Sequence, residues 1–146
     1  LVDALLLSFK HDIKNRPIEI HNNVDNHINF LSFAGRINQI ISNLIKNSLL
    51  HGFDEQDSGI INIDATLQSD TLTVIYHDSG KGVPESKLAS IFEPFYTTKR
   101  GQGGTGLGLN IIYNIITKMG GSIKAANHSN HGLEITFDLK VEQHAK

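Results

Sequence analysis

The chain contains the stretch Gly101-Gln102-Gly103-Gly104-Thr105-Gly106-Leu107-Gly108-Leu109, in which five of the first eight residues are glycine. It runs directly into residues 110–119, where apolar side chains recur at helical spacing. Glycine permits positive φ and close approach of a ligand, and a helix N-terminus adds unpaired N–H groups and the positive end of its dipole. The stretch therefore predicts a phosphate-binding loop that opens a helix. A flexible hinge before a core helix is the alternative, and the rest of the chain must decide between them.

Composition limits the classes of protein to which the chain can belong. Its 146 residues are enough for one domain with its own core. With 39% hydrophobic and 19% charged residues and a net charge of −2, no basic field favours nucleic acid as a partner. There is no cysteine, which excludes disulfides and Cys-ligated zinc. No apolar run is as long as a membrane span, and no signal peptide opens the chain. The first residue is Leu rather than Met, so we expect a piece of a longer protein.

The first half of the chain predicts a helix over residues 1–9, ended by Pro17, and short strands over 18–20 and 28–31 joined by an Asn-rich turn over 21–27. A second helix is predicted from Gly35 through Leu49, with Gly52 stopping it. Its apolar face comprises Ile37, Ile40, Ile41, Leu44, Ile45 and Ser48. The opposite polar stripe comprises Gln39, Asn43, Lys46 and Asn47.

The second half predicts two hairpins. Alternating residues over 61–67 and 72–76 form the first, which delivers Asp78 at the end of its second strand. One or two helical turns follow over 85–91, and residues 122–127 and 133–141 form the closing hairpin. Because strands and helices alternate too irregularly for a doubly wound sheet, the predicted fold is an α/β two-layer sandwich.

Four short motifs follow one another along this framework. They are Asn43-Leu44-Ile45-Lys46-Asn47-Ser48, Asp78-Ser79-Gly80-Lys81-Gly82, Phe92-Glu93-Pro94-Phe95 and Gly104-Thr105-Gly106-Leu107-Gly108-Leu109. In this order they resemble the N, G1, F and G2 boxes of the ATP-binding catalytic domain of sensor histidine kinases, in the GHKL superfamily shared with gyrase, MutL and a heat-shock chaperone. The resemblance covers nearly the whole chain. It implies the Bergerat ATP-binding fold, a mixed and largely antiparallel sheet covered on one face by helices.

The resemblance implies ATP and Mg²⁺ as ligands and gives the two asparagines roles. Asn43 and Asn47 lie one turn apart on a helix, and a neutral amide oxygen suits Mg²⁺, which keeps most of its waters and binds phosphate oxygens. We assign Asn47 to Mg²⁺ and Asn43 to support or phosphate contact. The predicted catalytic residues are Asn47, Lys46 and Thr105. Considered alone, the helix fits two solvated asparagines equally well.

Asp78 is predicted to accept a hydrogen bond from the exocyclic amine of adenine, with Gly80 and Gly82 clearing room for the base. Guanine presents a carbonyl at that position, and an unpaired buried group costs roughly 1–3 kcal/mol, so we expect a ~10-fold or greater preference for ATP. An ordinary turn aspartate is the structural alternative.

A lid is predicted from about Tyr96 to Gly106, with Phe92 packed in the core. Lys99 and Arg100 are candidates for phosphate contact, or are ordinary solvated charges. The whole predicted nucleotide-contacting set is Asn43, Asn47, His51, Asp78, Gly80, Gly82, Val83, Tyr96, Thr97, Thr98, Lys99, Arg100, Gly104, Thr105, Gly106, Leu107, Gly108 and Leu109.

Two positions depart from the family pattern. Leu50 stands where many members carry a basic residue, so Lys46 or His51 is the candidate substitute, and Leu133 stands where Thr is common. His11 lies in a segment similar to the phospho-acceptor box. An extra residue precedes its proline, and about 30 residues separate it from Asn43, too few for the helical hairpin that carries an acceptor.

The predicted function is therefore to bind Mg·ATP and donate the γ-phosphate to a histidine on a separate helical dimerisation domain, and so to reach a response regulator indirectly. We expect a cytoplasmic domain with no membrane contact of its own, in a parent kinase that can be membrane-anchored. One alternative is an anti-sigma-type serine kinase, which Asn47-Ser48-Leu49-Leu50-His51-Gly52 also resembles. The other is a degenerate module that only binds ATP or docks a partner.

Overall fold

The computed structural model describes residues 2–7, 9–10, 13, 16–24, 34–54, 58–93, 108–127 and 132–140. Its centre is a five-stranded sheet in the order β1-β2-β3-β5-β4. The strands are β1 (Ile18–Asn23), β2 (Gly59–Gln68), β3 (Thr71–Asp78), β4 (Ser122–Asn127) and β5 (Leu133–Lys140). Only the β1–β2 pair is parallel among these strands; the other three pairs are antiparallel.

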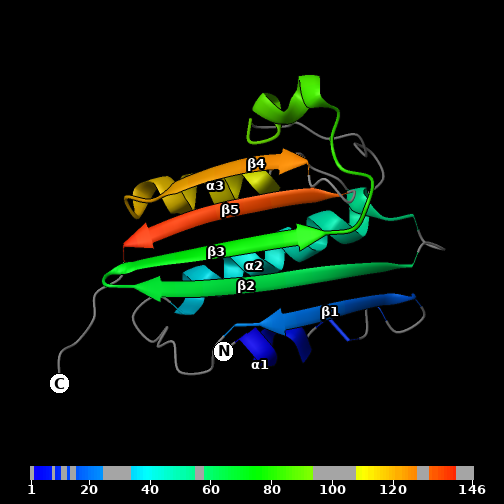
Figure 1. The fold of residues 1–146 in the computed structure, drawn as a ribbon, viewed down its shortest axis with the longest axis horizontal. Coiled ribbons are helices and arrows are strands. Elements are labelled where there is room, and N and C mark those ends of the chain that lie inside the picture. The colour runs from blue at the N-terminus through cyan, green and yellow to red at the C-terminus, as the bar shows by residue number, and fades with distance from the viewer. Residues whose placement is uncertain are drawn as a thin grey trace.

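The helices are α1 (Val2–Leu7), α2 (Ala34–Asn47), the π-helix η1 (Ser48–Gly52), the 3₁₀-helix η2 (Glu85–Ser90) and α3 (Gly108–Lys118). Helices α2 and α3 lie side by side against one face of the sheet (Figure 1). The predicted α/β two-layer sandwich, with a mixed and largely antiparallel sheet covered on one face by helices, is therefore confirmed.

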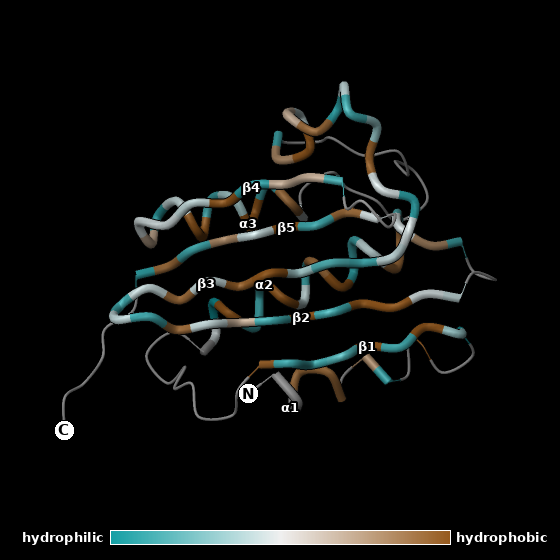
Figure 2. The backbone as a smooth tube through the Cα atoms, viewed as in Figure 1, coloured by the Kyte–Doolittle hydropathy of each residue, from teal (hydrophilic) through white to brown (hydrophobic). Residues whose placement is uncertain are grey.

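Alternation along the strands builds the core. In β3, Leu72, Val74 and Tyr76 are buried toward the helices, and in β5 Ile135 and Phe137 are buried beside them. Because successive side chains of a strand point to opposite faces, apolar and polar residues alternate along these strands, as Figure 2 shows. The side chain that continues the buried row of β3 is that of Asp78.

Helix α2 buries the face that its sequence predicts. Ile37, Ile40, Ile41, Leu44 and Ile45 are all buried against the sheet. The polar stripe is graded: Gln39 and Lys46 are exposed, whereas Asn43 and Asn47 are half-buried. The helical segment ends at Gly52, as predicted, and its last five residues form the π-helix η1 (Ser48–Gly52), in which the Phe53 N–H donates to the Ser48 carbonyl (3.1 Å) and the turn widens.

The N-terminal part corrects one prediction. The expected turn over 21–27 is wrong at its start, because His21, Asn22 and Asn23 continue β1 and pair with β2. The neighbouring strand supplies hydrogen-bonding partners that override the turn preference of the asparagines. The strand expected over 28–31 lies outside the described residues. Both predicted hairpins and the short helix after Pro84 are confirmed, as is a helix near the N-terminus.

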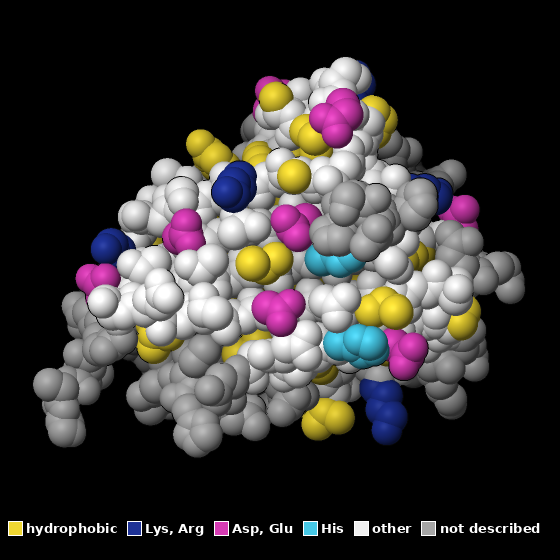
Figure 3. Space-filling view, in the orientation of Figure 1, with side chains coloured by type: hydrophobic (Ala, Val, Ile, Leu, Met, Phe, Trp, Pro, Cys, Tyr) yellow, Lys and Arg dark blue, Asp and Glu magenta, His cyan; other side chains and the backbone are white. Residues whose placement is uncertain are grey.

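The opposite face of the sheet is not covered by α2 or α3, and Figure 3 looks onto it. Acidic, histidine and hydrophobic side chains are interspersed there, and Ile60 and Ile75 are exposed (37% and 38%). None of the helices in the described parts of the chain has the length and apolar character needed to span a membrane.

Candidate functional site

Asp78 is the centre of a buried polar site. Its side chain ends β3 on the helix-facing side of the sheet and is only 2% exposed. Oδ1 accepts hydrogen bonds from the N–H groups of Gly80 (3.0 Å) and Leu133 (3.3 Å). Oδ2 accepts one from the hydroxyl of Ser48 (2.6 Å). Donors from three separate segments therefore hold this carboxylate, as a buried charge requires.

A tyrosine lies behind the serine. Tyr76 OH is 2.7 Å from Ser48 Oγ and donates to the carbonyl oxygen of Leu44 (3.1 Å). Burial raises the pKa of the Tyr76 hydroxyl well above its ordinary value, the hydrogen bond with Ser48 lowers it in part, and the charge of Asp78 raises it further. Tyr76 therefore stays a neutral hydroxyl at physiological pH.

The Ser48–Asp78 hydrogen bond brings two of the predicted motifs together. Ser48 opens η1 immediately after Asn47, the predicted metal ligand, and Asp78 is the predicted base-reading residue. The end of α2 and the end of β3 thus meet, although 30 residues separate the two side chains. The N-box and G1-box motifs are therefore adjacent in the fold.

Leu50, which replaces the basic residue common in the family, lies at the same helix end as its two candidate substitutes, Lys46 and His51. Lys46 is exposed on α2, while Leu50 and His51 are half-buried in η1. Among the described residues, no three His, Cys, Asp or Glu side chains gather in a way that can hold a metal ion. The predicted ligand for Mg²⁺ is the amide of Asn47, a donor suited to a cation that takes its other ligands from phosphate and water.

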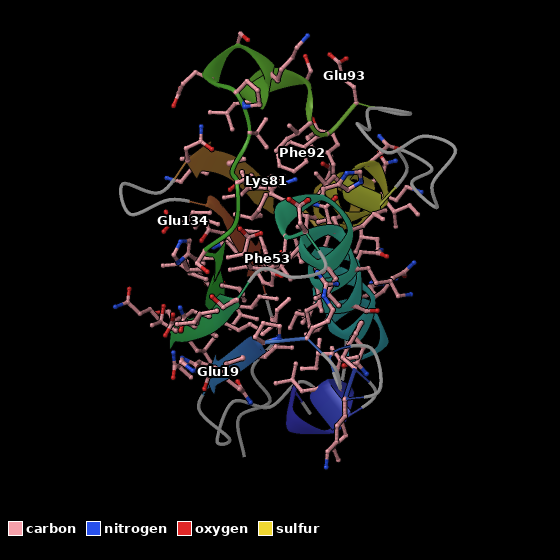
Figure 4. The ribbon with its side chains drawn as sticks, turned by 90° about the vertical axis from the view of Figure 1, so that its right-hand side faces the viewer. Glu19, Phe53, Lys81, Phe92, Glu93 and Glu134 are labelled. Carbon is pink, nitrogen blue, oxygen red and sulfur yellow. The ribbon has the colours of Figure 1, made fainter. Side chains whose placement is uncertain are left out.

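Two glycines allow the segment after β3 to pack against η1. A Cβ on Gly80 would lie 2.3 Å from the carbonyl oxygen of Gly52, and the Lys81 N–H donates to that oxygen (2.9 Å). The Lys81 ammonium also pairs with Asp54 at the surface (2.7 Å). Figure 4 looks at this end of the molecule and labels Phe53, which is buried, and Lys81, which is exposed. Gly80 therefore has a packing role in addition to the predicted room for a base.

Asn127 holds the next part of the same segment. Its Oδ1 accepts from the N–H of Val83 (2.9 Å), and its Nδ2 donates to the carbonyl oxygen of Val83 (2.6 Å). Gly82 has a φ of +72° at this point, and a Cβ there would lie 2.7 Å from Asn127 Oδ1. Glycine is therefore favoured at position 82 because L side chains rarely adopt this backbone conformation.

The start of α3 is the last described part of the site. Gly108 opens the helix and Leu109 is buried. Asn110 Nδ2 donates to the carbonyl oxygen of Phe92 (3.1 Å), whose ring stacks on Tyr113 with centroids 6.0 Å apart. Phe92 packs against the core, as predicted. Several predicted residues lie outside the described part of the chain: Tyr96, Thr97, Thr98, Lys99, Arg100, Gly104, Thr105, Gly106 and Leu107, and His11 as well.

Sequence reasoning missed four contributors to the site. The sequence places Tyr76 in an alternating strand, Ser48 on the apolar helix face and at the end of the N-box motif, and Asn127 and Gly132 in the closing hairpin, with no contact to Asp78 predicted for any of them. Gly132 has a φ of +97°, and a Cβ there would lie 1.7 Å from the carbonyl oxygen of Asp78. A hydroxyl on an otherwise apolar helix face, at Ser48, was the one sequence feature that pointed to a buried polar partner.

A family model described as "Histidine kinase-, DNA gyrase B-, and HSP90-like ATPase" matches residues 34–143, which include every motif of the site. The chain belongs to this family. Its curated relatives include the signal transduction histidine-protein kinase BaeS of Escherichia coli K12, 31% identical over 140 residues, which cover 93% of this chain and 29% of BaeS. The sensor histidine kinase ZraS of Salmonella typhimurium is 37% identical over 107 residues, covering 73% of this chain and 22% of ZraS. The chain thus spans less than a third of these relatives.

Solved structures agree with the histidine-kinase assignment. The catalytic domain of histidine kinase ThkA matches with a TM-score of 0.78 and 30% identity, covering 95% of this chain and 89% of that one. Full-length ShkA in complex with AMPPNP matches with a TM-score of 0.74 and 26% identity, covering 99% of this chain and 31% of ShkA. The chain is accordingly a histidine-kinase catalytic ATPase domain with the Bergerat fold, as the four motifs predicted.

Proposed function

We propose that this domain binds Mg·ATP and donates the γ-phosphate to a histidine on a separate helical dimerisation domain. The observation that carries the proposal is the buried Asp78 carboxylate, held by three donors beside the end of the asparagine-bearing helix. Binding of a nucleotide analogue by the relative ShkA, named in its complex with AMPPNP, supports the choice of ligand.

Asp78 selects the base in this proposal. A buried carboxylate accepts hydrogen bonds and donates none, so it pairs with the exocyclic amine of adenine and repels the carbonyl of guanine. Gly80, whose N–H donates to Asp78 Oδ1, brings backbone rather than a side chain next to the carboxylate, and Gly82 is assigned to making room for the base. The expected preference for ATP over GTP is about tenfold or more.

The phosphates and Mg²⁺ are assigned to the other motifs. Asn47 contributes its amide oxygen to Mg²⁺, which would neutralise charge on the phosphates, and Asn43 supports it. Lys46, or His51 in its place, supplies positive charge near the γ-phosphate. The remaining phosphate contacts are assigned to the predicted lid and G2 box, with Lys99, Arg100 and Thr105 as the polar members and Gly108 and Leu109 at the helix start. Phosphoryl transfer then depends mainly on positioning and charge stabilisation.

The partner is proposed from the kind of protein to which the relatives belong. BaeS and ZraS are named as histidine kinases and are more than three times as long as the part this chain matches. We therefore place the phospho-acceptor histidine on a separate helical domain of the same kinase, with a response regulator receiving the phosphate afterwards. We place the domain in the cytoplasm, where ATP is available, whether or not its parent is membrane-anchored.

Nucleotide binding is tested by thermal unfolding of the chain with and without Mg·ATP. We expect ATP to raise Tm, and Asn47→Ala and Asp78→Asn each to abolish the shift. Gln39→Ala, at an exposed position of α2, is the matched control and keeps it. A full shift in both site variants would remove the assignment of Asn47 and Asp78.

Phosphoryl transfer needs its own experiment. The chain is mixed with a helical domain that bears a phospho-acceptor histidine, and transfer from labelled ATP is measured. Phosphohistidine is acid-labile, whereas phosphoserine is acid-stable. Acid-labile label is expected. Acid-stable label would favour the serine-kinase alternative, and nucleotide binding without any transfer would favour a docking module.

A further inference from the structure

We propose that Ser48 is a positioning residue for base recognition: with Tyr76 behind it, its hydroxyl fixes the Asp78 carboxylate in the orientation that distinguishes adenine from guanine. The inference rests on the proposed ATP binding and extends it to residues that do not themselves contact the base. Ser48 and Tyr76 are both buried. Ser48 Oγ lies 2.6 Å from Asp78 Oδ2, and Tyr76 OH lies 2.7 Å from Ser48 Oγ.

The number of available protons decides which group donates in each hydrogen bond of the series that ends at Asp78. The series consists of three hydrogen bonds. They join Tyr76 OH to the Leu44 carbonyl oxygen, Tyr76 OH to Ser48 Oγ, and Ser48 Oγ to Asp78 Oδ2. Each hydroxyl supplies one proton, and a carboxylate supplies none. The proton of Ser48 must therefore point at Asp78. The proton of Tyr76 is then shared between Ser48 Oγ and the Leu44 carbonyl oxygen. The Ser48 hydroxyl therefore keeps its own proton for Asp78.

The same count limits what Asp78 can still accept. An ionised carboxylate offers about four acceptor positions. Gly80 and Leu133 occupy two on Oδ1, and Ser48 occupies one on Oδ2. About one position remains, on Oδ2, and it suits a single amine such as the exocyclic group of adenine.

Gly52 keeps this oxygen accessible. A Cβ at Gly52 would approach Asp78 Oδ2 at 3.2 Å, closer than most Cβ contacts. Oδ2 therefore has a fixed donor in Ser48 and a backbone neighbour without a side chain. Removing the Ser48 hydroxyl leaves only the Oδ1 bonds to orient the carboxylate among those described, so its remaining acceptor position is no longer fixed.

The test compares nucleotides that differ only at the base. Dissociation constants are measured with Mg²⁺ for ATP, GTP and purine riboside triphosphate, which lacks the exocyclic amine. In the unmodified chain, ATP is expected to bind about tenfold more tightly than the amine-free analogue. In Ser48→Ala, the Kd for ATP should rise about 5- to 10-fold while that for the analogue changes less than about twofold.

Conservative variants separate positioning from folding. Ser48→Thr keeps the hydroxyl and should restore the ATP-to-analogue ratio. Tyr76→Phe leaves Ser48 in place and should narrow the ratio by a smaller factor, about two- to threefold. Ser42→Ala, at a half-buried serine of α2, is the matched control and should leave the ratio unchanged.

Three results would count against the proposal in distinguishable ways. If Ser48→Ala weakens ATP and the amine-free analogue by the same factor, the hydroxyl has only a structural role and the inference fails. An unchanged ratio in both Ser48→Ala and Tyr76→Phe overturns it as well. If the unmodified chain binds none of the three nucleotides, both the proposed function and the inference that rests on it are refuted.

Discussion

The backbone of Gly80 lies directly against that of Gly52, so close that a Cβ on Gly80 would stand 2.3 Å from the Gly52 carbonyl oxygen. The Lys81 N–H donates to the same oxygen (2.9 Å). This contact joins the segment that follows Asp78 to the end of the helix that carries Asn43 and Asn47. The geometry of the proposed nucleotide site therefore depends on two positions that carry no side chain.

Gly80→Ala is expected to destabilise the domain by roughly 1–3 kcal/mol, because the added methyl group meets a backbone atom that cannot rotate away. It should also weaken Mg·ATP binding by displacing the Gly80 N–H from Asp78. Urea unfolding and nucleotide titration measure the two effects. Gly35→Ala is the matched control, since nothing lies within 4 Å of a Cβ there and Gly35 is on an exposed helix surface. Equal stability of the two variants would contradict the prediction.

Arg16 is expected to stabilise the end of the asparagine-bearing helix. Its guanidinium donates to the carbonyl oxygens of Leu49 (3.2 Å), Phe53 (3.4 Å) and Asp54 (3.2 Å). A cation at a helix C-terminus offsets the negative end of the dipole and satisfies carbonyls that have no helical partner. Arg16→Ala should cost about 1–2 kcal/mol in urea unfolding.

Two further variants test the cause. Arg16→Lys should recover less than half of the loss, because a single ammonium cannot reproduce the planar fork that reaches three carbonyls. Lys118→Ala, at an exposed point charge in the last turn of α3, should cost about 0.5 kcal/mol or less. Full recovery by lysine would show that charge alone matters.

Asn127 is expected to be intolerant of a carboxylate. In Asn127→Asp, the donor that now meets Val83 O (2.6 Å) and Glu85 Oε1 (3.3 Å) is replaced by an oxygen that repels both. The expected loss of stability is roughly 1–3 kcal/mol. Adding Glu85→Gln should recover part of it, which a double-mutant cycle measures. Additive effects of the two changes would contradict the proposed contact.

The buried tyrosine predicts a pH dependence at high pH. Burial is the main cause that raises the pKa of Tyr76 above its ordinary value of 10.0, whereas the unfolded chain titrates at that ordinary value. Above about pH 10 the unfolded state therefore binds fewer protons than the folded state, so stability falls as pH rises. The contribution is fully present below that pH and is progressively lost above it.

Urea unfolding of the unmodified chain and of Tyr76→Phe checks the sign. Their difference in unfolding free energy should be constant below about pH 9.5 and then change in favour of the variant. Tyr113→Phe, at a residue that is 43% exposed, controls for the loss of a phenol hydroxyl in general. A difference that does not vary up to about pH 11 would show that Tyr76 is not buried as described.

Much of the fold was predictable because local patterns and burial agree. The face of α2 and the alternation of β2, β3 and β5 each follow from a single periodicity. The turn predicted to begin at His21 was wrong, because a parallel neighbour made His21, Asn22 and Asn23 part of β1. Such pairing depends on β2, which lies some 40 residues further along the chain, and no local pattern reveals it.

The sequence by itself determined the two-layer fold, the order of the four motifs and the place of Asp78 at the end of a strand, since each depends on residues close together along the chain. Only the tertiary structure decided that Ser48, Tyr76, Gly132 and Asn127 support that aspartate and the segment after it. The hydrogen bonds of Ser48, Tyr76 and Asn127 join residues that lie between 28 and 44 positions apart, so they depend on how the helix end and the strand ends are oriented. Directional hydrogen bonds of this kind form only after the apolar core has fixed the distances between those elements.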